Sequence, residues 1–147
     1  NESGKEGFVI RFYPSDYRVK IKFEEYVRLH KIMTNFSTRN IWETLANGED
    51  LMTSLVDVPD EFHEKIKAYV DELTSQFETL EREYKWIFKI LNRSITEVYN
   101  VPKEKQRSVF AQYAKNYKYP AILFKMLDGR DYTKIIWDLL YPEYRKI

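Results

Sequence analysis

The sequence has no cysteine and only four glycines among 147 residues, whereas aromatic residues make up 16%. Without cysteine, neither disulfide bonds nor thiolate metal sites can form. Few glycines and many long side chains favour helices over a turn-rich β fold. No apolar run approaches the roughly 18–20 residues that span a bilayer, and the first residues lack a signal-peptide pattern. We therefore expect a cytoplasmic protein without a membrane partner. Because residue 1 is not methionine, we also expect the chain to begin inside a larger protein.

A length of 147 residues predicts one domain, or one small domain with a piece of another. The net charge of +1 hides an asymmetry along the chain. Residues 50–86 hold ten acids and four bases, a net of −6, whereas residues 93–147 hold eleven bases and six acids, a net of +5. The basic region could contact phosphates, although solvated helix faces of mixed sign explain the same counts.

Two short segments near the start have the pattern of β-strands. Residues 7–13 are β-branched and aromatic, and residues 17–23 alternate strictly between apolar and basic side chains. A turn cluster at residues 14–16 separates them. The pattern predicts a hairpin, and because an isolated hairpin is marginal in water, we expect it to belong to a sheet that lies mostly upstream.

Helical patterns follow the hairpin. An apolar stripe with spacings of three and four residues begins after Pro59 and runs for about thirty residues. Large side chains such as Phe62, Phe77 and Tyr84 favour packing within the chain over a two-chain coiled coil. Five further helices are predicted, at residues 24–34, 39–47, 102–116, 120–128 and 131–141, with a short segment at 51–56. Ser37-Thr38 is the expected N-cap of 39–47, and Gly48 is its expected end. Asp131 is expected to cap the last helix, and Pro142 to end it. The sequence thus predicts a mainly α fold: a β-hairpin remnant in domain 1–38 and an all-helical domain 39–147.

Lys20 and Lys22 are the first candidates for a functional site. Alternation places them on one face of a strand, about 7 Å apart. Two ammonium groups at that distance repel each other unless an anion lies between them, and a nucleotide phosphate would serve. Glu6, at the start of the partner strand, could hold a divalent metal such as Mg²⁺. The alternative is structural, because lysines on an edge strand also prevent aggregation.

The residues around these positions resemble a known family. Glu6-Gly-Phe-Val-Ile-Arg11, followed by Lys20-Ile-Lys-Phe-Glu-Glu25, resembles motifs IV and V of the covalent nucleotidyltransferase superfamily. Residues 19–45, including Tyr26-Val-Arg-Leu-His30 and Ile41-Trp-Glu43, are similar to the phage-type RNA ligase 1 family and its bacterial relatives. The resemblance covers about residues 6–45. Beyond them the chain resembles such ligases only in being helical.

This resemblance implies an ATP-dependent RNA ligase that acts in RNA or tRNA repair with Mg²⁺. A lysine would attack ATP to form a lysyl-adenylate, the AMP would move to an RNA 5′-phosphate, and a 3′-hydroxyl would displace it. Lys20 and Lys22 match the motif V lysines that contact the nucleotide phosphate. Glu6 matches the metal-linked acid of motif IV, and Gly7 permits close backbone approach beside it. The implied partners are RNA, with a broken tRNA as one candidate, and an upstream nucleotidyltransferase domain of the same protein.

The nucleophile motif of the family, Lys-x-Asp-Gly, is missing from these 147 residues. The run Lys125-Met-Leu-Asp-Gly129 has one residue too many and follows motif V instead of preceding it. We interpret its Asp-Gly as the end of a helix. We therefore expect this chain alone to be unable to form the lysyl-adenylate.

The remaining candidates are weaker. A basic segment with interleaved tyrosines could dock RNA, or it could be a solvated helix face; its cations are Lys103, Lys105, Arg107, Lys115 and Lys118. His30 and His63 form no ligand set, and His30 is expected to pack. Trp42, Trp86 and Trp137 are expected in the core. The alternative to a ligase is a stand-alone helical module that binds RNA or protein. A DNA or capping nucleotidyltransferase is disfavoured, because helices follow motif V where those enzymes have an OB-type β domain.

Overall fold

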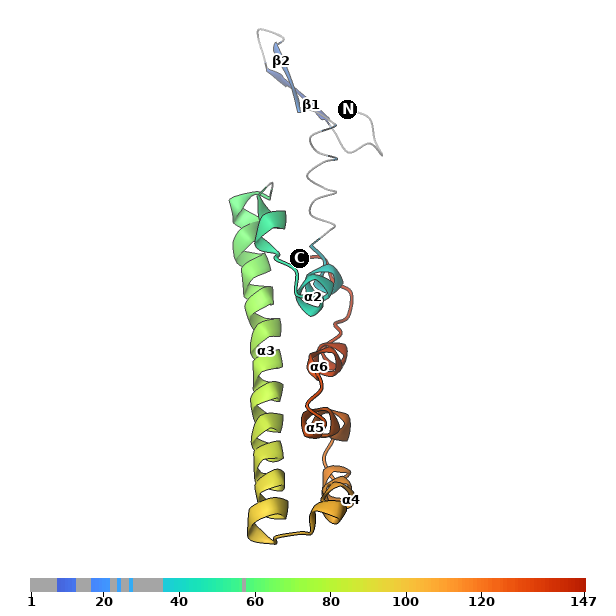
Figure 1. Cartoon of the computed structure of the whole chain (residues 1–147). Helices are drawn as coiled ribbons and strands as arrows, with labels where there is room; N and C mark the ends of the chain where they lie inside the picture. Colours follow the sequence, from blue (N-terminus) through green and yellow to red (C-terminus); the bar gives the residue numbers. More distant parts are fainter. Residues whose placement is uncertain (1–7, 13–16, 22–23, 25–26, 28–35, 57) are drawn as a thin grey trace. The chain divides into compact units, whose positions relative to one another are not determined.

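The computed structural model of the chain divides into two compact units, unit 1 (Asn1–Tyr69 with Pro142–Ile147) and unit 2 (Val70–Tyr141) (Figure 1). The predicted boundary between residues 38 and 39 falls within unit 1 and stays a prediction. Most described residues are helical, which confirms the mainly α fold class. The residues that the structure describes are 8–12, 17–21, 24, 27, 36–56 and 58–147.

The predicted hairpin is present as two antiparallel strands, β1 (Phe8–Phe12) and β2 (Tyr17–Ile21). The register pairs Phe8 with Ile21 and Phe12 with Tyr17. Within the described residues these strands form a two-stranded sheet. That the hairpin is the remnant of a nucleotidyltransferase sheet stays a prediction.

Helix α2 (Thr38–Ala46) begins and ends one residue before the predicted bounds of 39–47. Ser37 is its N-cap, and the Ser37 hydroxyl accepts a hydrogen bond of 3.2 Å from the backbone N–H of Asn40. Gly48 follows with φ +70°, a left-handed conformation that glycine adopts without a Cβ penalty.

Two further predicted segments flank α2. The segment predicted at 51–56 forms a 3₁₀ turn, η1 (Met52–Leu55), with Leu55 buried. The helix predicted over residues 24–34, including His30, lies mostly outside the described residues. Of that segment Glu24 and Val27 are described, and both are helical.

The last residues of the chain bind the start of α2 within unit 1. The Thr38 hydroxyl donates to the carbonyl of Glu143 and accepts from the backbone N–H of Arg145 at 3.0 Å. The Thr38 N–H donates to the Arg145 carbonyl at 2.9 Å, and Ser37 forms an antiparallel bridge with Lys146. Ser37 and Thr38 are buried although both are polar, because hydrogen bonds satisfy their polar atoms.

Replacing Thr38 by valine should lower the free energy of unfolding by about 1–3 kcal/mol, because two backbone groups lose their partner in a buried place. Chemical denaturation monitored by circular dichroism measures this. Thr79→Val is the matched control, since the exposed Thr79 hydroxyl bonds only to the Ser75 carbonyl one turn earlier. An equal loss in both variants would contradict a special role for Thr38.

The predicted long helix is α3 (Asp60–Arg93), 34 residues in one element. Asp60 and Glu61 lie in its first turn, where acids complement the helix dipole. Its buried apolar residues are Ile66, Tyr69, Leu73, Tyr84, Ile87 and Leu91. Over the described residues, no helix is both long enough and apolar enough to cross a membrane.

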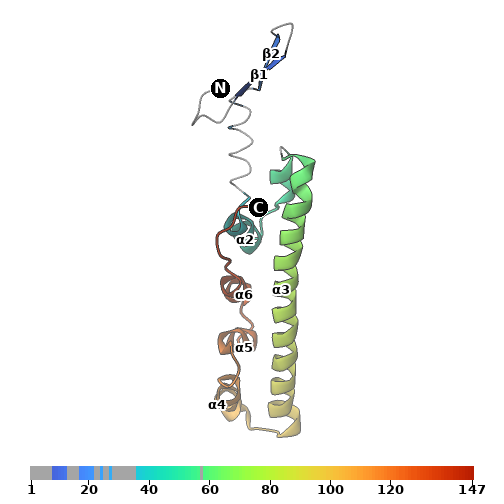
Figure 2. The same ribbon diagram turned by 180° about the vertical axis from the view of Figure 1, so that it is seen from behind.

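A π-helical turn, η2 (Ser94–Val98), follows α3 directly and was not predicted. The Tyr99 N–H donates to the Ser94 carbonyl at 2.8 Å. Asn100 then has φ +49°, a left-handed conformation that asparagine tolerates better than most residues. From here the chain turns back along α3 (Figures 1 and 2).

The three shorter predicted helices follow one another along α3 in unit 2 (Figures 1 and 2). They are α4 (Lys103–Ala114), α5 (Pro120–Leu127) and α6 (Thr133–Leu139). Asp128 is the C-cap of α5 and Gly129 has φ +65°, which confirms that this Asp-Gly ends a helix. Asp131, predicted to cap α6, lies one residue before the N-cap Tyr132, and its carboxylate accepts from the Thr133 N–H at 2.9 Å.

The core of unit 2 joins one face of α3 to the shorter helices. Phe110 of α4 meets Phe88 and Phe124 edge to face, each with ring centroids 5.9 Å apart. The Tyr84 hydroxyl accepts a hydrogen bond of 3.0 Å from the Tyr119 N–H. In unit 2 the apolar stripe of α3 is thus covered from within the chain, as predicted.

The prediction that all three tryptophans lie in the core is wrong for Trp86, which is 64% exposed. Trp86 follows the buried Tyr84 by two residues, which turns it by about 200° around the helix. Trp42 and Trp137 are half-buried, and Trp137 stacks on Phe77 with centroids 4.7 Å apart.

Candidate nucleotide and RNA contact residues

Lys20 lies on β2, where the antiparallel register places it opposite Val9 of β1. Two positions along the strand, Arg18 lies opposite Arg11. The strand that was predicted to carry Lys20 is therefore present. It pairs with β1, which carries Phe8 and Val9 of the Glu-Gly-Phe-Val run.

The other predicted catalytic and cofactor-binding residues, Glu6, Gly7 and Lys22, lie outside the described residues. Among the described residues no group of three or more His, Asp or Glu side chains is arranged to hold a metal ion. His63 contacts the Leu55 carbonyl at 3.1 Å and the Asp60 carboxylate at 3.8 Å. The proposed roles of Glu6, Gly7, Lys20 and Lys22 therefore stay predictions.

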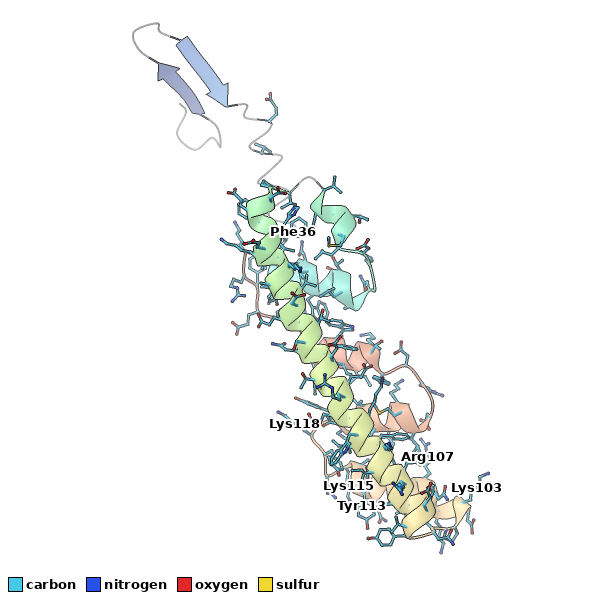
Figure 3. All side chains as sticks on the ribbon, turned by 90° about the vertical axis from the view of Figure 1, so that its left-hand side faces the viewer. Phe36, Lys103, Arg107, Tyr113, Lys115 and Lys118 are labelled. Atoms are coloured by element: carbon cyan, nitrogen blue, oxygen red, sulfur yellow. The ribbon has the colours of Figure 1, made fainter. Side chains whose placement is uncertain are left out.

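The predicted basic segment is exposed, but its cations do not form one strip. Lys103 and Arg107 belong to α4, Lys115 is its C-cap, and Lys118 lies before α5. Figure 3 shows Lys115 and Lys118, with Tyr113, on one side of α3 and Lys103 and Arg107 on the other. Lys105 is also exposed and lies on α4, between Lys103 and Arg107 in the sequence. An RNA strand would therefore meet two separate basic groups.

Arg107 has a partner within the protein. Its guanidinium donates to both carboxylate oxygens of Asp128, with the Nη2–Oδ2 distance at 3.3 Å. Such a fork fits the planar guanidinium and ties α4 to the end of α5. The hydrogen bond from Arg107 lowers the pKa of the Asp128 carboxyl. One of the three cations Lys103, Lys105 and Arg107 is thus already paired with a carboxylate.

Arg107→Gln should raise the pKa of Asp128 toward its ordinary value of 3.8, because the largest cause of its lowering is removed. The pair stabilises the fold above that value, and its contribution disappears as the pH falls through the lowered pKa. An NMR titration of the Asp128 carboxyl carbon measures the change. Arg130→Gln, which removes a weaker influence, should shift it less; an unchanged pKa in Arg107→Gln would contradict the assignment.

A shallow pocket of about 250 Å³ adjoins this group. Ile95, Phe110 and Leu127 provide its apolar walls, and Lys103 and Gln106 provide polar groups. The Gln106 amide donates to the Val101 carbonyl at 3.1 Å, which occupies one of its donors.

One group of exposed residues was missed by the sequence reasoning. Arg82, Trp86, Lys89 and Arg93 lie on α3 and all four side chains are exposed. Their spacing of four, three and four residues is a helical stripe in its own right. These four residues lie on a different face of α3 from the apolar stripe. That difference would have revealed the group from the sequence if Trp86 had not been assigned to the core.

The comparisons with known proteins are negative. No family model matches the chain, and neither a curated protein nor a solved structure matches it. A functional assignment therefore depends on the two motifs, on the strands that carry them and on the chemistry of the exposed residues.

Proposed function

We propose that the chain is the carboxy-terminal part of an ATP-dependent RNA ligase of the phage RNA ligase 1 type. The observation that carries the proposal is the spacing of Glu6-Gly-Phe-Val9 and Lys20-x-Lys22. The pairing of β1 with β2 supports it, because both motifs then belong to one antiparallel hairpin. The alternation of residues 17–23 gives Lys20 and Lys22 a shared direction toward a phosphate.

The reaction proposed for the whole enzyme has three steps. A lysine amine outside these 147 residues attacks the α-phosphorus of ATP and pyrophosphate leaves. The AMP passes to the 5′-phosphate of an RNA, and the 3′-hydroxyl of a second end attacks that phosphate and releases AMP. Lys20 and Lys22 would stabilise the negative charge that develops at phosphorus in these steps. Mg²⁺, with Glu6 among its ligands, would add charge neutralisation when bound.

The helical part of the chain would select the RNA, with a broken tRNA as one candidate substrate in the cytoplasm. The helices that follow the hairpin support this assignment over a DNA ligase or a capping enzyme. The exposed cations of unit 2 supply the charge that a polyanion requires. The alternative is a stand-alone helical module that binds RNA or protein without catalysis, in which the hairpin is only structural.

An end-joining assay tests the proposal. A protein that contains this chain together with the residues encoded upstream should circularise a 5′-phosphorylated single-stranded RNA in the presence of ATP and Mg²⁺. Denaturing gel electrophoresis separates circles from linear RNA. Lack of joining by a folded protein, with RNA ends of several lengths, would reject the ligase and leave the binding module.

A further inference from the structure

The outer face of α3 in unit 2 has an exposed indole among cations. Trp86 is 64% exposed, and Ile90, one turn later, is 43% exposed. Arg82, Lys89 and Arg93 stand four residues before, three after and seven after Trp86, so all three share its face. Figure 1 shows α4, α5 and α6 along one side of α3, and Tyr84, Ile87 and Leu91 are the buried residues of α3 in the core that they share.

The charges on this face are largely free to meet an anion. Within the described part of the chain, Arg82 and Lys89 form no ion pair. Arg93 pairs with Glu97 at 3.2 Å, but both side chains are 69% exposed, so an incoming phosphate could replace the carboxylate. The three cations of the stripe stand against two exposed acids, Glu78 four residues before Arg82 and Glu83 three before Trp86.

We propose that Arg82, Trp86, Lys89 and Arg93 form a docking surface for single-stranded RNA. An RNA base stacks on the Trp86 indole, and flanking phosphates contact Arg82 and Lys89. This combination of an aromatic platform with cations along one line is how proteins hold single strands without reading their sequence. The proposal rests on the proposed function, in which the substrate is RNA.

The size and charge of the surface favour a nucleic acid over a protein. The stripe from Arg82 to Arg93 is about 16 Å long, enough for a few nucleotides. A stable protein interface buries about 800 Å² on each partner with an apolar centre. Trp86 and Ile90 are two apolar side chains enclosed by cations, which is too little apolar surface for that purpose.

Tryptophan fluorescence of the 147-residue chain tests the proposal, because Trp86 is the most exposed of the three indoles. Titration with a 5′-phosphorylated oligouridylate should quench the emission, whereas a fully paired RNA duplex should quench it much less. Trp86→Phe should abolish the quenching but retain binding, measured separately by anisotropy of a labelled RNA. Trp86→Ala should weaken binding about tenfold or more.

The contribution of Arg82 and Lys89 is measured separately, through the salt dependence of RNA binding. Arg82→Gln with Lys89→Gln should reduce the salt dependence of log K by about 0.7 for each lost phosphate contact. Lys67→Gln, an exposed position nearer the start of α3, is the control and should leave affinity and salt dependence unchanged. Circular dichroism verifies that each variant is folded.

Three results would overturn the inference. The first is an RNA affinity of Trp86→Ala equal to that of the unchanged chain, and the second is a lack of oligouridylate binding. The third is self-association through Trp86 in sedimentation, which would assign the face to a second copy of the chain. Each differs from failure of the ligase proposal, which is read from end joining by the longer protein. Normal joining with an unchanged KM for RNA in Trp86→Ala would reject the docking surface alone.

Discussion

Replacing Phe110 by alanine is expected to lower the free energy of unfolding by about 3–5 kcal/mol. The Phe110 side chain is 1% exposed and is the largest fully buried side chain of the described residues. Its ring meets Phe88 of α3 and Phe124 of α5 edge to face. Alanine would remove both contacts and leave a cavity at the place where three helices meet. Because small domains are stable by only about 5–15 kcal/mol, this variant should be close to unfolding at 37 °C.

Urea denaturation, followed by far-ultraviolet circular dichroism, measures this effect. Tyr113→Ala is the matched control, since Tyr113 lies on the same helix three residues later and is 52% exposed. The control should change stability by no more than about 0.5 kcal/mol. Equal losses in the two variants would mean that the packing described around Phe110 is not the source of stability in unit 2.

The second large effect is expected in catalysis. Under the proposed function, Lys20→Ala or Lys22→Ala in the longer protein should reduce the rate of RNA sealing about 10²–10³-fold, because each would remove a positive charge that the proposal places against a reacting phosphate. Single-turnover sealing of a 5′-adenylated RNA measures the last step without the first. Lys65→Ala, which removes an exposed lysine from the first turns of α3, should seal at the normal rate.

An outcome in which both lysine variants seal as fast as the unchanged protein would support the structural interpretation of Lys20 and Lys22. Their charge would then serve only to keep the strand from pairing with other chains. Loss of folding is excluded by comparing the unfolding transitions of the variants with that of Lys65→Ala.

Features with a local cause were predicted correctly. The alternation of residues 17–23 predicted β2, and the 3–4 spacing after Pro59 predicted α3. Caps and helix ends such as Ser37, Gly48 and Gly129 depend on neighbours within a few residues. All of these signals are contained in short windows of sequence.

Features with a distant cause could not be predicted in this way. Thr38 forms hydrogen bonds with Glu143 and Arg145, which are more than a hundred residues away in the sequence. The residues next to Thr38 do not indicate those partners. Arg107 was predicted to contact RNA, and only the folded chain brings Asp128 to its guanidinium. Whether a surface cation is free or paired is decided by tertiary structure.

The candidate site was predictable in its strand but not in its chemistry. The position of Lys20 on β2 follows from the alternation, whereas Glu6, Gly7 and Lys22 lie outside the described residues. The proposed ligase reaction also requires a nucleophilic lysine in a Lys-x-Asp-Gly motif, which these 147 residues do not contain. The exposed position of Trp86 needed correct phasing of α3, because a shift of two residues moves a side chain to the other face.

The most direct test of the central claim is the search for a covalent AMP adduct by mass spectrometry after incubation with ATP and Mg²⁺. The protein that includes the upstream residues should carry one AMP on a lysine of a Lys-x-Asp-Gly motif, and residues 1–147 alone should carry none. An adduct on residues 1–147, or none on the longer protein, would contradict the assignment of this chain as the motif V and helical part of an RNA ligase.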